Sequence, residues 1–221
     1  MADVKSFLLT PELATYLVEH GSPPDAVQLG LIEETAALGA IAGMQISPEQ
    51  GAFLTLLTRI LGVKSAVEVG TFTGYSSLCI ARGLAPGGKL LCCDVSEEWT
   101  AMARRAWDAA GVADRIELKI APGADTLRAL PATETIDLAF VDADKPGYPV
   151  YFDELVKRLR PNGVLLVDNV LWGGNVVKSD ADAGDDNTRA IKAFNDMVVA
   201  DDRVEAVMLP IADGLTLCRK K

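Results

Sequence analysis

Short apolar stretches of strand character alternate with helical stretches along most of this chain of 221 residues. We expect strands at 65–69, 89–94, 115–120, 136–141 and 163–167, and helices at 74–83, 97–110, 123–130, 147–159 and 187–200. Strands that alternate with helices form a parallel sheet with helices on both faces. Two further strands, 203–210 and 214–220, are joined by a short turn, so one of them must be antiparallel to its neighbour.

Three helices are expected ahead of the first strand, at 11–20, 25–38 and 47–61. Ser47 is the expected N-cap of the third, with Pro48 at the first helical position and Gln50 three residues after the cap, as in a capping box. The length suits a single domain, residues 1–221, in which residues 1–45 form an N-terminal helical cap.

Charge and composition exclude several classes of protein. The net charge of −10 argues against nucleic acid or an anionic membrane as partner, because both attract basic surfaces. No apolar run approaches the roughly 18 residues of a membrane-spanning helix, and the N-terminus lacks a signal-peptide pattern. We expect a cytoplasmic protein whose cysteines are reduced, namely Cys79, Cys92, Cys93 and Cys218.

The first two expected strands end in residues suited to a nucleoside. The stretch EVGTFTGYS, 68–76, contains Gly70 and Gly74, whose spacing differs from the GxGxxG of dinucleotide-binding proteins. Asp94 ends the second strand, 20 residues after Gly74, where a carboxylate accepts hydrogen bonds from ribose hydroxyls. From these residues alone, a nucleoside ligand and an ordinary glycine-rich turn are equally open.

Two other expected strands end in acidic, oxygen-rich tips. LAFVDADKPGY, 138–148, ends its apolar run at Asp142, Asp144 and Lys145, and GVLLVDNVLWGG, 163–174, leads into Asp168 and Asn169. Two carboxylates and an amide oxygen suit a hard divalent cation such as Mg²⁺, Mn²⁺ or Ca²⁺. Spacing alone also allows two separate solvated turns.

From about Met44 onward these motifs, together with LPIADGLTLCRK, resemble the metal-dependent O-methyltransferases of the caffeoyl-CoA and catechol type. The resemblance implies a Rossmann-like, seven-stranded, mostly parallel sheet with one antiparallel strand. It implies methyl transfer from S-adenosylmethionine to a hydroxyl of a catechol-type phenolic acceptor that a divalent metal, most simply Mg²⁺, chelates. It also implies a homodimer.

The resemblance implies roles for individual residues. Lys145 would be the general base, and Trp172 would flank the acceptor ring. The metal ligands would be Asp142, Asp168 and Asn169, and the cofactor contacts would be Met44, Glu68, Gly70, Ser76, Asp94, Gly123, Asp142 and Asp144. Ile46 and Gly123 depart from the family, in which Thr and Ala are frequent at these positions.

Two other functions stay open at this point. A nicotinamide-dependent dehydrogenase fits the fold class but lacks GxGxxG, and a non-catalytic cofactor-binding protein of the same fold would not need the full set of acidic residues and Lys145. Trp99 and Trp107 are expected to pack their helix rather than to contact substrate. The acidic loop 175–187 is a candidate lid over the acceptor, and its charge predicts that small catechols are preferred to coenzyme A thioesters.

Overall fold

The computed structural model describes residues 9–179 and 185–221. Its α-helices are α1 (Pro11–Glu19), α2 (Ala26–Ala36), α3 (Pro48–Ile60), α4 (Tyr75–Gly83), α5 (Glu97–Ala109), α6 (Gly123–Ala129), α7 (Tyr148–Arg158) and α8 (Asp186–Ala200). Short 3-10 helices are η1 (Gly39–Met44), η2 (Ala113–Arg115), η3 (Lys145–Gly147) and η4 (Trp172–Val177). The strands are β1 (Ser65–Val69), β2 (Lys89–Asp94), β3 (Ile116–Ile120), β4 (Ile136–Val141), β5 (Leu159–Asp168), β6 (Val204–Leu209) and β7 (Leu215–Lys220).

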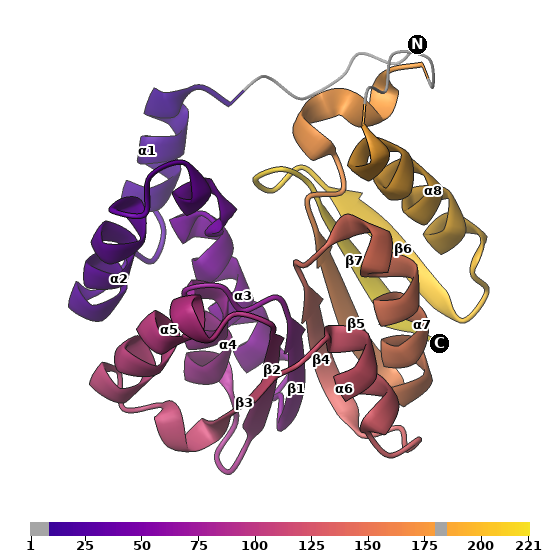
Figure 1. The fold of residues 1–221 in the computed structure, drawn as a ribbon, viewed down its shortest axis with the longest axis horizontal. Helices are drawn as coiled ribbons and strands as arrows, with labels where there is room; N and C mark the ends of the chain where they lie inside the picture. The colour runs from indigo at the N-terminus through magenta and orange to yellow at the C-terminus, as the bar shows by residue number, and fades with distance from the viewer. Residues whose placement is uncertain (1–8, 180–184) are drawn as a thin grey trace.

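One seven-stranded sheet has the order β3-β2-β1-β4-β5-β7-β6. β1 pairs in parallel with both β2 and β4, whereas β7 is antiparallel to both β5 and β6. Figure 1 shows α2 to α5 on one side of the sheet and α6 to α8 on the other. The expected Rossmann-like sheet with one reversed strand is confirmed. The strand order reverses at β1 and β4, where such sheets bind ligands beyond the carboxyl ends of their strands.

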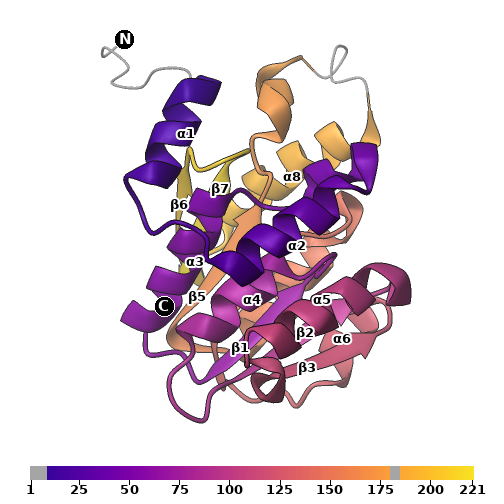
Figure 2. The same cartoon turned by 90° about the vertical axis from the view of Figure 1, so that its left-hand side faces the viewer.

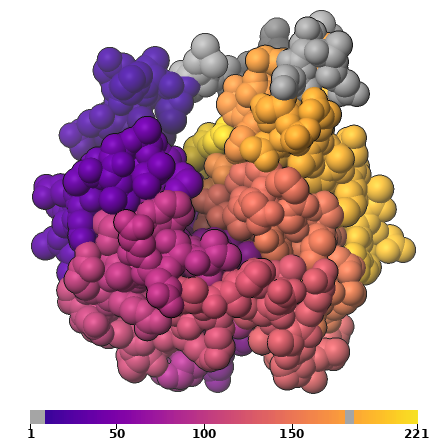
Figure 3. Space-filling view, in the orientation of Figure 1, coloured from indigo at the N-terminus to yellow at the C-terminus, as the bar shows by residue number. Residues whose placement is uncertain are grey.

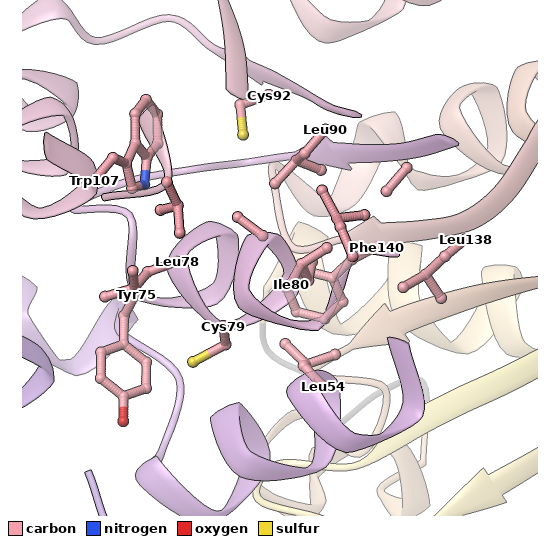
Figure 4. Packing of buried hydrophobic residues seen from close by; sticks show 14 of the residues in the cluster. Leu54, Tyr75, Leu78, Cys79, Ile80, Leu90, Cys92, Trp107, Leu138 and Phe140 are labelled. Atoms are coloured by element: carbon pink, nitrogen blue, oxygen red, sulfur yellow. The ribbon is translucent and has the colours of Figure 1, made fainter. Parts of the chain in front are cut away.

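Alternation along the strands divides the apolar core into two layers. Ala66 of β1 faces the layer that α3, α4 and α5 cover, and its neighbour Val67 faces the layer beneath α6, α7 and α8. Figure 4 shows the first layer, where Leu54 and Ile80 lie near Phe140 of the sheet. Both faces of the sheet are therefore buried. This explains why the sequences of the strands are continuous apolar runs, without alternation of apolar and polar residues.

Helices α1 and α2 lie on the same side of the sheet as α3, α4 and α5, the side that faces the viewer in Figure 2. α2 carries a capping box between Asp25 and Gln28, and it buries Leu31. α3 begins as expected, with Ser47 in extended conformation and Pro48 as its first residue. The predicted capping box of α3 is wrong, because no side-chain hydrogen bond caps this helix within the described chain.

β5 begins earlier than the sequence predicts. Leu159 already pairs with Ile136 of β4, and the register then shifts so that Val164 pairs with Leu138. Asn162 lies between these pairs with a positive φ of 61°. This irregularity interrupts the strand, which is why only its second half has a clear strand pattern in the sequence.

All four cysteines are buried and free, as expected for reduced thiols. Among the described residues, no helix is both long enough and apolar enough to cross a membrane.

The chain leaving β1 passes very close to the end of β4. Gly70 has φ 91°, and a Cβ built on it would lie 1.8 Å from the backbone oxygen of Asp142 at the end of β4. The Asp142 N–H in turn donates to the Val69 oxygen at 2.9 Å. Only glycine allows β1 to turn away while its end stays in contact with the end of β4.

Replacing Gly70 with alanine should lower the free energy of unfolding by about 2–5 kcal/mol, since a left-handed non-glycine residue and a backbone clash both cost energy. The matched control is Gly30→Ala in α2, where a Cβ meets no atom within 4 Å. That change should raise stability by about 0.5–1 kcal/mol. Urea unfolding followed by circular dichroism measures both, and a neutral Gly70→Ala would contradict the close approach.

Glu68 is a wholly buried carboxyl in the middle of the fold, with an exposed fraction of 0%. Neither of its oxygens has a hydrogen-bond partner among the described residues. Burial raises the pKa of Glu68 to about 7, although the nearby hydroxyls of Ser76 and Thr71 oppose the shift. A carboxyl that is costly to ionise at neutral pH therefore lies in β1, directly below the turn at Gly70.

The pKa of Glu68 is raised in the folded state, from the ordinary value of 4.5 to about 7. The contribution of Glu68 to the stability of the unliganded protein should therefore be fully present below about pH 4.5 and should be lost as the pH rises through about 7. Glu68→Gln abolishes this loss. The stability difference, variant minus unmodified protein, should grow between pH 5 and pH 8 by on the order of 2–3 kcal/mol. Glu98→Gln, at an exposed site in α5, is the control. A constant difference across this range would mean that Glu68 is already ionised.

Candidate functional site

A cavity of about 770 Å³ opens beyond the carboxyl ends of β1, β2, β4 and β5. Figure 3 shows a depression on this side, between the N-terminal helices and the segments around η4 and α8. The cavity is lined by every candidate site residue except Glu68, namely Met44, Gly70, Ser76, Asp94, Gly123, Asp142, Asp144, Lys145, Asp168, Asn169 and Trp172. Residues that are far apart in the sequence thus share one chamber, because the parallel strands that carry them end at one edge.

One end of the cavity is built around Asp94. Its Oδ2 accepts the N–H groups of Thr71 and Phe72, both at 2.8 Å, and its Oδ1 accepts the Ser96 N–H at 2.8 Å. These three bonds hold the carboxylate rigidly at the end of β2. A carboxylate has about four acceptor positions, so one remains for a ligand hydroxyl.

Glu68 lies below this part of the cavity rather than on its wall. Its neighbour Ser76 does line the chamber. Gly123 is closely packed, since a Cβ there would lie 2.7 Å from Val69 Cγ1 and 3.2 Å from the Tyr151 ring. The departure from the family's frequent alanine therefore suits the packing around this residue.

The two acidic tips meet at the other end of the cavity. Lys145 lies between them, with its Nζ 2.7 Å from Asn169 Oδ1 and 3.2 Å from Asp142 Oδ1. The same Nζ donates to the Tyr148 hydroxyl at 2.5 Å, and that hydroxyl donates to the backbone oxygen of Asp168 at 3.0 Å. The structure therefore answers the question that spacing left open, because the tips of β4 and β5 form one cluster.

The cluster is electrostatically strained. Burial raises the pKa of both Asp142 and Asp168, and the negative charge of Asp142 raises that of Asp168 further. The Lys145 ammonium opposes both shifts. The Asp168 carboxylate is buried and that of Asp142 is largely buried, and Lys145 is the one ammonium that contacts Asp142 among the described residues, so the pair favours a second cation.

The donor set fits a hard divalent cation. Asp142, Asp168 and Asn169 supply two carboxylates and one amide oxygen, and oxygen donors are those that Mg²⁺ and Mn²⁺ prefer. No cluster of three or more His, Cys, Asp or Glu that could hold a metal occurs in the described part of the chain. The fit therefore depends on the amide oxygen of Asn169 as the third ligand, with the remaining positions left to water or an acceptor.

Trp172 forms a side wall next to Lys145, whose Nζ lies 5.5 Å from the centre of the indole. Trp172, Gly173 and Gly174 all have positive φ angles. The turn between β6 and β7 fixes this unusual backbone, since Asp213 Oδ1 accepts the Gly173 N–H at 2.6 Å. Sequence reasoning gave Asp213 no role in the site.

Other lining residues were also missed. Trp107 packs in the core as expected, but Trp99 lines the cavity beside Asp94 and meets Phe72 edge to face at 5.2 Å. Trp99 therefore lies in the cavity wall, and the expectation that it does not contact substrate stays a prediction. Tyr151 also lines the cavity, where its hydroxyl donates to Asp144 Oδ1 at 2.5 Å.

The acidic loop is only partly described. Asp180 and Asp182 lie outside the described residues. Asp185 caps α8 by accepting the Thr188 N–H at 2.7 Å, and Asp186 pairs with Arg189 at 2.5 Å. Asn187, at the same end of α8, lines the cavity. The acidic start of α8 therefore lies at the edge of the cavity.

Comparisons with known proteins point to one family. The sequence model of the family described as O-methyltransferase matches residues 19–221. A probable caffeoyl-CoA O-methyltransferase of Dictyostelium discoideum is 38% identical over 211 residues, which cover 94% of this chain and 91% of the relative. The O-methyltransferase from Bacillus cereus, solved in complex with SAH, has a TM-score of 0.86 and 31% identity, covering 95% of this chain and 97% of that one.

TomG, an O-methyltransferase from Streptomyces achromogenes solved in complex with SAM, has a TM-score of 0.86 and 29% identity, covering 95% of this chain and 96% of its own. The family match spans nearly the whole cavity lining, and the Dictyostelium relative aligns over almost its full length. The chain thus belongs to the O-methyltransferase family.

Proposed function

We propose that this protein transfers the methyl group of S-adenosylmethionine to a hydroxyl of a catechol-type phenolic acceptor, with a divalent cation at Asp142, Asp168 and Asn169. The observation that carries the proposal is the cluster in which these three residues and Lys145 meet in one cavity with Asp94. The family and the SAM-bound and SAH-bound structures support the donor.

Asp94 and the turn after β1 would hold the donor. The fixed carboxylate of Asp94 has an acceptor position left for the ribose hydroxyls, and Gly70 and Ser76 line the path toward the acidic cluster. Met44, Gly123 and Asp144 line the same half of the proposed site. Glu68 lies beneath the cavity wall, and its carboxyl would influence the donor site through the neighbouring Ser76.

Asp142, Asp168 and Asn169 would hold the cation, most simply Mg²⁺. When bound, a divalent ion supplies Lewis acidity and a template that orients two adjacent hydroxyls. With such an ion bound, the carboxylates of Asp142 and Asp168 would have a counter-charge. Trp172 lies where it would flank the acceptor ring.

Lys145 would take the proton of the attacking hydroxyl at its Nζ. Tyr148 and Asn169 hold that nitrogen at 2.5 and 2.7 Å, so its position is set before an acceptor enters. The Nζ must be a neutral amine to take this proton. Methyl transfer then joins the acceptor oxygen to the methyl carbon as the bond from sulfur to that carbon breaks.

The cation is tested by its removal. Turnover of a catechol should vanish in chelator and return with Mg²⁺ or Mn²⁺. Asp142→Ala and Asp168→Ala should each remove most turnover. Asp168→Ala should leave the affinity for S-adenosylmethionine, measured by calorimetry, little changed. Full activity in excess chelator would overturn the proposed role of the metal.

Lys145→Met should lower kcat by about 10²–10⁴-fold, the usual contribution of a positioned base. The loss should be smaller for nitrocatechols, which ionise more readily than catechol. Rates for a series of acceptors of different pKa check this. An equal loss across the series would show that Lys145 does not accept the proton.

The acceptor is proposed to be a small catechol rather than a coenzyme A thioester, although the Dictyostelium relative is named for a thioester. Asp185, Asp186 and Asp213 add negative charge near the cavity, and this charge repels the phosphates of coenzyme A. Replacing Asp182, Asp185 and Asp186 with Asn should selectively raise kcat/KM for caffeoyl-CoA. Added salt should reduce the difference in kcat/KM between small catechols and caffeoyl-CoA in the unmodified protein. A higher kcat/KM for caffeoyl-CoA than for caffeic acid in the unmodified protein would contradict the proposal.

We also propose a cytoplasmic homodimer. The edge strand β6 and the helices α1 and α3 lie along one side of the molecule in Figure 2. They expose large apolar side chains, namely Tyr16, Leu17, Leu56, Ile60, Val207 and Met208. Analytical ultracentrifugation should give a dimer that Ile60→Lys weakens, and a monomer at all concentrations would refute it.

A further inference from the structure

Gln50 breaks the local rule that its position in α3 predicts. A Gln three residues after a Ser N-cap normally returns to the backbone of the cap. Here the Ser47 hydroxyl is buried without a hydrogen-bond partner among the described residues, and the Gln50 amide points elsewhere. Sequences depart from such local preferences most often at functional sites.

The amide of Gln50 reaches across the cavity edge to Asp168. Its Nε2 donates to Asp168 Oδ2 at 2.8 Å, across 118 positions of sequence. Both side chains are buried, with exposed fractions of 1% and 2%. The other carboxylate oxygen, Oδ1, accepts the Asn169 N–H at 2.8 Å. Each oxygen of Asp168 is thus held by one donor, which fixes the plane of the carboxylate and leaves each oxygen a free lone pair.

We propose that Gln50 is a positioning residue of the cation site and tunes its affinity and its choice of metal. This inference rests on the proposed function, because it concerns the cation held by Asp142, Asp168 and Asn169. A hydrogen bond to a ligating carboxylate orients that ligand, and loss of such a bond typically weakens metal binding by about 10–100-fold.

The choice of metal follows from geometry. Mg²⁺ demands near-ideal octahedral coordination, whereas Ca²⁺ accepts flexible and variable geometry. A carboxylate held in one plane by Gln50 and by the Asn169 N–H favours the stricter ion. A carboxylate released on one side loses more affinity for Mg²⁺ than for Ca²⁺, so the ratio of the two affinities reports on positioning.

A purely structural role would have a different signature. The bond also ties the first turn of α3 to the end of β5, so its loss destabilises the protein whatever its effect on metal. Thr58 offers a matched control on the same helix. It is wholly buried, and its hydroxyl bonds only to the Leu54 carbonyl at 2.6 Å, which Thr58→Val removes without touching Asp168.

The experiment measures metal binding to the unliganded protein, without turnover. Gln50→Met, which is similar in size and has no donor, and Gln50→Asn, whose amide is too short to reach, are compared with Thr58→Val and the unmodified protein. Calorimetric titrations with Mg²⁺ and Ca²⁺, and Mn²⁺ titrations followed by electron paramagnetic resonance, give the dissociation constants. Circular dichroism and thermal unfolding select the variants that fold.

Both Gln50 variants should bind Mg²⁺ about 10–100-fold more weakly, should lose less affinity for Ca²⁺, and should bind S-adenosylmethionine as before. Thr58→Val should bind Mg²⁺ like the unmodified protein. Equal Mg²⁺ affinities in the unmodified protein and the folded Gln50 variant would overturn this inference alone. Failure of the unmodified protein to bind any of these ions would overturn the proposed metal site and this inference with it.

Discussion

The contact between the ends of β1 and β4 determines the rest of the site. Gly70 passes so close to the Asp142 backbone that no side chain fits between them. This approach brings the turn that holds Asp94 to one side of β4 and the acidic cluster to the other, within one cavity. A donor bound along β1 would thereby have its reactive end directed at the tips of β4 and β5.

Stability and chemistry oppose each other in this centre. Glu68 and Asp168 are buried, Asp142 is largely buried, and the pKa of each of these carboxyls is raised. Lys145 is the one cation in contact with Asp142 and Asn169 among the described residues. Such an arrangement costs folding energy at neutral pH when no ligand balances it. Cationic ligands would recover that cost, so binding and folding are linked in this protein.

The sequence predicted the features that depend on local pattern. Short apolar runs that alternate with helical stretches predicted the strands, and the shared edge of a parallel sheet followed from them. The roles of Asp142, Asp168, Asn169 and Lys145 came from a family resemblance, and only the structure shows that they converge. The role of Gln50 could not be predicted from local sequence, which indicated a helix cap. Its hydrogen bond to Asp168 joins residues 118 positions apart. The contact of Asp213 with Gly173 likewise arises from packing between distant segments.

The position of β7 has a consequence for synthesis on the ribosome. β7 is the last strand in chain order, yet it lies inside the sheet between β5 and β6. Until residue 220 leaves the exit tunnel, β5 has an unpaired edge next to Asp168, and the backbone around Gly173 lacks the support of the β6–β7 turn. A nascent chain can therefore complete the β1 side of the sheet early, but the acidic cluster acquires its final shape only when the reversed strand inserts.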